Sequence, residues 1–267
     1  MIIALIQAAT EADGVRPVSE ATELALRSGA APVTVHRNGE LAGFAYAAGR
    51  SAELVVAPKW RRQGVGSELL AGLRPDRVWA HGRLPAAEAF AAHHGYVADR
   101  VLWQLRRPAA DVPEMPLPQG VSLRSFVPGQ DEEEWLRVNS RAFADHPDQG
   151  KWTRTDLLAR EKESWFDPAG FLLAIKHDRL VGFHWTKIHS DGIGEVYVLG
   201  LDPALQGSGL AKPLTIAGLR SLADRGVDEL MLYVDESNTA AMHLYKRLAF
   251  ADYRADVQFV SPSARRS

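Results

Sequence analysis

Three side chains late in the sequence have the types and spacing for proton-transfer chemistry. Glu195 stands at the start of an apolar run, and Asn238 and Tyr245 lie seven residues apart in a segment of helical character. Seven residues make two helical turns, so the amide and the phenol share one face. A carboxylate in a partly desolvated cleft can take a proton from an ammonium group, and a phenol can return one to a departing thiolate. Each has a plainer alternative, namely a surface ion pair, a helix cap and a half-buried core aromatic.

The segment 194–220 is expected to position this chemistry. An apolar strand leads through Asp202-Pro203 into the loop Gln206-Gly207-Ser208-Gly209-Leu210-Ala211, and a helix with apolar residues at helical spacing follows. Glycines ahead of a helix let backbone N–H groups point outward at its positive end, which binds phosphate or pyrophosphate. No Gly-Lys-Ser/Thr follows, so the loop is not of the Walker type. An ordinary glycine-containing turn fits one such segment equally well.

The first half of the chain contains the same landmarks in the same order, which indicates a duplicated domain. The matched segments are 41–44 with 180–183, 54–58 with 199–203, 61–66 with 206–211, and 86–96 with 240–250. The first-half counterparts of the three candidate residues lack their chemistry: Arg50 for Glu195, Ala91 for Tyr245 and Leu84 for Asn238. We therefore expect the first half to be non-catalytic. Whether its loop still binds the same kind of ligand or is a relic stays open.

Composition restricts the class of protein. The 267 residues are 46% hydrophobic and 24% charged, with a formal net charge of -2, which is typical of a globular protein of one or two domains. No basic block favours a nucleic-acid partner. The chain has no cysteine, which excludes disulfides, thiolate metal sites and a cysteine nucleophile, and we expect no metal. The apolar segment 1–10 is too short for a membrane span, and we expect the core face of a helix there.

Periodicity and turn residues predict the elements. In the first half we expect helices at 2–12, 20–28, 64–73 and 86–94, and strands at 32–36, 41–48, 52–56, 78–81 and 97–105. In the second half we expect strands at 121–126, 171–175, 179–189, 194–201, 229–234 and 253–260, and helices at 132–144, from 153, after 211 and at 238–248. Asn38-Gly39 predicts a hairpin, and Thr153 with Asp156 a capping box. Prolines make 108–120 an extended linker between domains at 1–107 and 121–267.

The loop 206–211 resembles the acyl-CoA signature of the GCN5-related N-acetyltransferases (GNAT), and longer runs resemble the mycothiol synthases among them. The most specific are Gly182-Phe183-His184-Trp185-Thr186-Lys187 and the run 194–200, with weaker matches from residue 12 to residue 234. The resemblance implies an α/β (α+β) protein of two tandem GNAT-fold domains, each a mixed, mostly antiparallel sheet flanked by helices. The first of them starts within its first helix and lacks its first strand.

The resemblance also implies roles by position. It makes Glu195 the general base and Tyr245 the general acid, and it makes Glu20, Asp148, Lys187, Glu195 and Tyr233 ligands of the acceptor. Asp148 stands where the family usually has glutamate. The implied acetyl-CoA contacts are Leu54, Val55, Val56, Arg62, Gln63, Gly64, Val65, Gly66 and Ser67 in the first half, and Leu199, Gly200, Leu201, Gln206, Gly207, Ser208, Gly209, Leu210, Ala211, Lys212, Asn238, Thr239, Ala240, Ala241, Met242 and His243 in the second.

Three of the implied acceptor ligands also have a purely structural interpretation. Lys187 could be a solvated charge on a strand, Glu20 a residue of a helix cap and Asp148 a turn residue. We expect a backbone N–H at an irregular point near Leu199-Gly200 to bind the oxyanion. The expected protein is a cytoplasmic, monomeric enzyme that moves acetyl from acetyl-CoA directly to the cysteinyl amine of Cys-GlcN-Ins, in the last step of mycothiol biosynthesis. The alternatives are an N-acetyltransferase for amino acids or aminoglycosides, and a non-catalytic acyl-CoA sensor.

Overall fold

The computed structural model describes residues 1–144, 146 and 149–266, and the chain forms two compact units. Unit 1 comprises Met1–Gln104, Asp235–Thr239 and Tyr253–Ser267, and unit 2 comprises Leu105–Val234 and Ala240–Asp252. Strand β11 begins in unit 2, but its larger part lies in unit 1, where residues 257–260 pair with β4. The structure therefore differs from the predicted division at residue 121, because the last strand of the second half completes the sheet of the first unit.

Unit 1 has the strand order β1-β2-β3-β4-β11. Its elements are α1 (Ile2–Asp13), α2 (Glu20–Arg27), β1 (Val33–Arg37), β2 (Glu40–Ala48), β3 (Ser51–Val56), α3 (Val65–Leu73), β4 (Arg77–Ala80), α4 (Pro85–His93), the start of β5 (Val97–Pro108) and most of β11 (Ala251–Val260).

The hairpin β1–β2 forms as predicted. Arg37 pairs with Glu40, and both loop residues are left-handed, Asn38 at φ 51° and Gly39 at φ 79°. Alternate residues of β2 then face opposite layers. Phe44 packs with the apolar face of α1, and Ala45 packs with that of α3, so one helix covers each face of this sheet.

Unit 2 has the strand order β10-β9-β8-β7-β6. Its elements are the end of β5, β6 (Val121–Ser125), α5 (Glu132–Ala142), α6 (Arg154–Glu161), β7 (Phe171–Lys176), β8 (Arg179–Ile188), β9 (Gly194–Leu201), α7 (Ala211–Ala223), β10 (Glu229–Asp235), α8 (Thr239–Arg247) and the start of β11. Thr153 and Asp156 form the predicted capping box of α6. Residues 112–118 of the predicted linker have no helix or strand.

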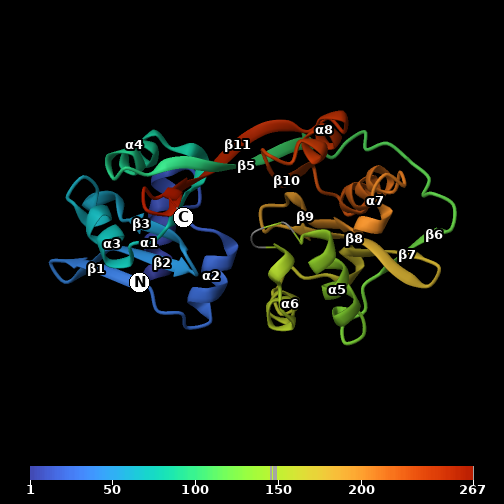
Figure 1. Ribbon diagram of the computed structural model, residues 1–267, viewed down its shortest axis with the longest axis horizontal. Helices are drawn as coiled ribbons and strands as arrows, with labels where there is room; N and C mark the ends of the chain where they lie inside the picture. Colours follow the sequence, from blue (N-terminus) through green and yellow to red (C-terminus); the bar gives the residue numbers. More distant parts are fainter. Residues whose placement is uncertain (145, 147–148, 267) are drawn as a thin grey trace. The chain divides into compact units, whose positions relative to one another are not determined.

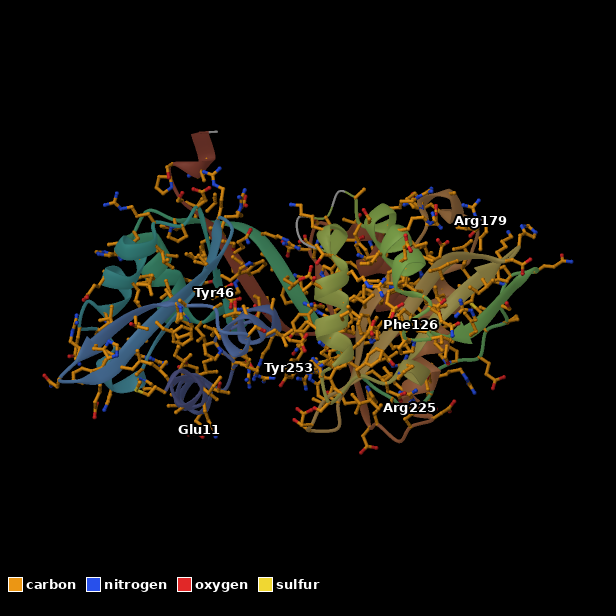
Figure 2. The ribbon with its side chains drawn as sticks, turned by 90° about the horizontal axis from the view of Figure 1, so that it is seen from below. Glu11, Tyr46, Phe126, Arg179, Arg225 and Tyr253 are labelled. Atoms are coloured by element: carbon orange, nitrogen blue, oxygen red, sulfur yellow. The ribbon has the colours of Figure 1, made fainter. Side chains whose placement is uncertain are left out.

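The core of unit 2 is strongly aromatic. The ring of Phe126, labelled in Figure 2, stacks on that of Phe171 with centroids 4.4 Å apart, and Phe171 stacks on Trp185 at 4.3 Å. Trp135 of α5 is fully buried among these rings. Figure 1 shows α5 and α6 on one side of β8 and β9 and α7 on the other, where Leu210 and Leu214 make a second cluster. Within the described residues, no helix is long and apolar enough to cross a bilayer.

Candidate active site

Strand β9 contains a bulge at Tyr197. Its neighbour Val196 pairs with Thr186 and Val198 pairs with Trp185, so Tyr197 is the extra residue on the bulged strand. Tyr197 and Val198 accordingly both contact the aromatic cluster, whereas Leu199 faces α7. The bulge reverses the alternation of side chains between the two ends of β9.

The bulge lies about two residues before Leu199-Gly200, near which an irregular point was predicted, and oxyanion binding there stays a prediction. The glycine there has a different cause. A Cβ at Gly200 would lie 2.7 Å from the ring of Phe183, so the absent side chain gives that buried ring its space. A glycine in a strand indicates either a bulge or a close approach, and the sequence does not distinguish them.

Strands β9 and β10 pair only over a short distance. Within the described residues, the parallel register comprises Leu230 with Gly194, Met231 with Glu195 and Leu232 with Val196, and it ends where the bulge begins. The backbone groups of β9 beyond this point therefore have no ladder with β10. A gap between two parallel strands is a place where a ligand with amide groups can bind by strand-like hydrogen bonds.

Glu195 lies on the strand just before the bulge and is only 7% exposed. It pairs directly with Lys187 across the β8–β9 ladder, so both side chains are on the face of the aromatic cluster. One carboxylate oxygen, Oε2, is 2.7 Å from His189 Nε2. The alternative of a surface ion pair does not describe this glutamate, because its carboxylate is largely shielded from water.

Lys187 is held against aromatic rings. Its ammonium lies 4.5 Å from the ring centroid of Trp165 and 5.2 Å from that of Tyr197. With 8% of its surface exposed it is not a solvated strand charge. The Tyr197 hydroxyl in turn accepts a hydrogen bond of 2.8 Å from Arg160 Nε. Cation–π contact is favourable for a desolvated ammonium, so this arrangement fixes Lys187 beside Glu195.

Tyr245 lies on α8 in unit 2 and is 7% exposed, with its ring 5.9 Å from that of Phe250. Burial raises the pKa of its phenol to about 12, so the hydroxyl keeps its proton at neutral pH. Asn238 directly precedes α8, the place expected of an N-cap. The catalytic role of Tyr245 and the ligand role of Asn238 stay predictions.

The two glycine-containing loops have the same backbone pattern. Residues 207 and 209 are left-handed, with φ of 77° and 79°, and so are their counterparts 62 and 64, with φ of 61° and 79°. Arg62 thus adopts a conformation that the second half gives to glycine. The described structure gives neither α7 nor α3 a side-chain cap, which leaves N–H groups of the first turn for a ligand.

The other predicted ligands are distributed over both units. Glu20 is the first residue of α2 in unit 1, where Ser19 and not Glu20 caps the helix. Tyr233 is on β10 in unit 2 and is 42% exposed. Asp148 lies outside the described residues. The predicted acetyl-CoA segments occupy the ends of β3 and β9, the loops before α3 and α7, and the start of α8.

The first-unit counterparts of the candidate residues have structural roles. Arg50 forms an ion pair with Asp76, and Ala91 is a buried residue of α4. Leu84 directly precedes α4 and gives it no side-chain cap in the described structure. That the first half is non-catalytic stays a prediction.

Sequence reasoning missed His189. Its ring reaches Glu195 because residue 189 is two positions beyond Lys187, the cross-strand partner of Glu195, and is therefore a diagonal neighbour on the same face. The spacing Lys187-x-His189 in a predicted strand was the available signal.

Known proteins resemble the chain over nearly its whole length. A model described as the acetyltransferase (GNAT) family matches residues 133–250. A mycothiol acetyltransferase from Thermomonospora curvata is 52% identical over 275 residues, which cover 98% of this chain and 93% of that protein. The chain belongs to the mycothiol acetyltransferase family. This confirms the resemblance inferred from residues 182–187 and 194–200 and makes the protein an acyltransferase.

Solved structures agree with the fold. A GCN5-related N-acetyltransferase from Sphaerobacter thermophilus aligns with a TM-score of 0.68 at 28% identity, over 97% of this chain and 90% of that one. A tandem GNAT protein from the clavulanic acid biosynthesis pathway aligns with a TM-score of 0.72 at 18% identity, over 97% and 93%. The expected GNAT fold in tandem is confirmed.

Proposed function

We propose that this protein transfers acetyl from acetyl-CoA to the cysteinyl amine of Cys-GlcN-Ins, with Glu195 as general base and Tyr245 as general acid. The relatives named mycothiol acetyltransferase support the acceptor, since they match at about half of all positions over nearly the full chain. The structure supports a proton-transfer site in unit 2. The proposal includes action in the cytoplasm as a monomer.

Acetyl-CoA is a fitting co-substrate for the loop before α7. The left-handed residues Gly207 and Gly209 turn the backbone ahead of the uncapped helix, whose N–H groups suit a pyrophosphate. The end of the β9–β10 pairing at Val196 leaves backbone groups of β9 that suit the amide-containing pantetheine arm. The same loop pattern at Arg62 and Gly64 supports acyl-CoA binding by the first unit, which the proposal leaves non-catalytic.

The buried carboxylate beside a fixed cation is the observation that carries the proposal. An acceptor amine is mostly protonated near neutral pH and must lose a proton before it attacks the thioester. Glu195 can take that proton, and the Lys187 ammonium opposite it balances the carboxylate charge before the acceptor enters. Lys187, Glu20, Tyr233 and Asp148 are proposed to bind the polar groups of the acceptor, as the family resemblance implies.

On the thiolate side, the Tyr245 phenol is protonated at neutral pH, and burial raises its pKa further, to about 12. It can therefore donate a hydrogen bond to the sulfur on which charge develops. No covalent acyl-enzyme is needed, and the chain has no cysteine to form one. Direct attack of the amine on the thioester is therefore the simplest mechanism.

Steady-state kinetics with several acceptors tests the proposal. We expect kcat/KM for Cys-GlcN-Ins to exceed that for simple cysteinyl amines, free amino acids and an aminoglycoside by at least about 100-fold, which needs roughly 3 kcal/mol of selective binding. Equal or greater turnover of an amino acid or aminoglycoside would favour the general amine acetyltransferase. Binding of acetyl-CoA without turnover of any acceptor would favour the sensor.

A further inference from the structure

We propose that His189 is a positioning residue that holds the carboxylate of Glu195 in the orientation for taking a proton from the acceptor amine. His189 Nε2 lies 2.7 Å from Glu195 Oε2, within the range of a charge-assisted hydrogen bond. The inference rests on the proposed function, because it assumes that Glu195 is the base. It adds a residue that neither the sequence motifs nor the family resemblance assigns.

The backbone around His189 is itself fixed. Its N–H donates to the carbonyl of Ile193 at 2.9 Å, and its carbonyl accepts from the N–H of Gly192 at 2.9 Å. These two bonds close the turn between β8 and β9. The imidazole therefore extends from a closed turn, and the turn gives Glu195 a partner of defined position.

The need for such a partner follows from Lys187. This ammonium is on the residue directly opposite Glu195, and cross-strand partners have Cβ atoms only about 5 Å apart. A flexible carboxylate beside a cation is drawn toward it, and it is then a poor acceptor for the proton of a second cation. The hydrogen bond to His189 holds Oε2, which leaves Oε1 for the N–H of the acceptor.

The proton balance is simple. The N–H bond of the acceptor ammonium breaks and an O–H bond forms at Oε1 of Glu195, so the carboxylate becomes neutral and the amine gains its lone pair. His189 donates its Nε2 hydrogen to Oε2 before and after this step and exchanges no proton. A side chain that keeps a neutral N–H donor at the same reach should therefore replace it.

Substitution at His189 tests the inference with three variants. His189→Gln keeps an N–H donor of similar reach, and His189→Leu removes the donor. His189→Asn keeps an N–H donor on a side chain too short to reach Oε2 of Glu195. Loss of a hydrogen bond to a charged group predicts that kcat for His189→Leu and His189→Asn falls about 10- to 150-fold. His189→Gln should stay within about fivefold, and KM for acetyl-CoA within about twofold in all three. His36→Leu, on an exposed residue of β1, is the matched control and should behave as wild type.

A double-mutant cycle separates positioning from a general structural role. In the Glu195→Gln background, His189→Leu should cause no further loss of kcat, because the group that it positions is already gone. A further loss in that background, or equal kcat for the Gln and Asn variants, overturns the inference. Because His189 is partly exposed, with 28% of its side chain accessible, these variants should fold, and His189→Asn keeps the test valid if the leucine variant does not.

The outcomes also distinguish this inference from the proposed function. If wild type does not acetylate Cys-GlcN-Ins, or if Glu195→Gln retains full turnover, the proposed function fails. If both of those results are as expected and His189→Leu retains full kcat, only the role of His189 fails.

Discussion

Replacement of Tyr245 by phenylalanine removes one hydroxyl from a residue that is otherwise kept in place by packing. The ring contact with Phe250 at 5.9 Å does not involve the oxygen, so the variant should fold. The phenol has a pKa of about 12, against roughly 8.5 for an alkyl thiol. Complete transfer of its proton to a free thiolate is therefore uphill by about 5 kcal/mol. A hydrogen bond to the developing negative charge avoids this cost.

The expected magnitude follows from that comparison. A hydrogen bond to a charged group contributes about 1.5–3 kcal/mol, so kcat of Tyr245→Phe should fall about 10- to 150-fold. The acetyl-CoA dissociation constant should stay within about twofold, because the hydroxyl acts mainly when charge develops on sulfur. The acceptor itself carries a thiol, so the assay should quantify the N-acetylated product by chromatography.

Two results would refute this reasoning. A change in kcat of less than about threefold would leave Tyr245 a core aromatic. A loss beyond about 10⁴-fold with unchanged acetyl-CoA binding would exceed what one hydrogen bond to a charged group contributes, and the expected magnitude would be wrong. Tyr253→Phe is the matched control, since Tyr253 is 46% exposed, and it should retain wild-type kinetics.

Three further predictions concern the loop, the helix behind it and a buried ion cluster. Gly209→Ala should weaken acetyl-CoA binding by about 5- to 30-fold, because alanine at φ 79° costs about 1–2 kcal/mol, whereas Gly192→Ala at φ 85° should leave the calorimetric Kd unchanged. Gly218→Ala should lower the melting temperature by at least about 2–4 °C, since its Cβ would lie 2.1 Å from the buried ring of His184. His81 contributes stability fully below about pH 6.5, and this contribution is lost as pH rises toward about 10, so urea titrations should show a fall that His81→Gln lacks.

The physical basis of the last prediction is a buried cluster in unit 1. Burial lowers the pKa of His81, but hydrogen bonds to Asp256 at 2.8 Å and Glu53 at 3.1 Å outweigh it and raise the pKa to about 10. The imidazolium thus joins β3 and β11. If stability of wild type and His81→Gln changes in parallel between pH 6.5 and 10, the imidazole is not protonated and the interpretation is wrong.

Gly72→Ala is the control for Gly218→Ala. Both glycines are within helices, but a Cβ at Gly72 meets only Val33 at 3.4 Å, an ordinary contact. Alanine there should be neutral or stabilise by up to about 1 kcal/mol. An unchanged or higher melting temperature for Gly218→Ala would show that His184 can move. Burial lowers the pKa of His184 to about 4, so its neutral ring donates from Nδ1 to the carbonyl of Leu214.

Local sequence rules predicted the parts of the fold that local geometry determines. Asn38-Gly39 requires two left-handed residues, and Thr153 with Asp156 satisfies helix N–H groups by itself, so both were found. The duplicated loop was also predictable from the sequence, because its left-handed backbone conformation favours glycine. Arg62 shows that the conformation persists where the glycine has been replaced.

Features made by distant segments were not predictable in this way. The pairing of β11 with β4 joins residues about 180 positions apart, and the sequence of neither strand indicates which strand it pairs with. The bulge at Tyr197 depends on the register between β8 and β9. The contact of Glu195 with His189 depends on both side chains lying on the same face of the sheet. The candidate base and acid were identified from residue type and family resemblance, whereas their burial required the three-dimensional structure.

The most direct measurement is the turnover of Glu195→Gln with Cys-GlcN-Ins at saturating acetyl-CoA, with acetyl-CoA binding measured on the same protein. Because the amide cannot accept the proton, kcat should fall about 10²- to 10⁴-fold while the acetyl-CoA Kd stays within about twofold. Turnover within about threefold of wild type, with the protein folded and acetyl-CoA bound, would contradict the assignment of Glu195 as the base.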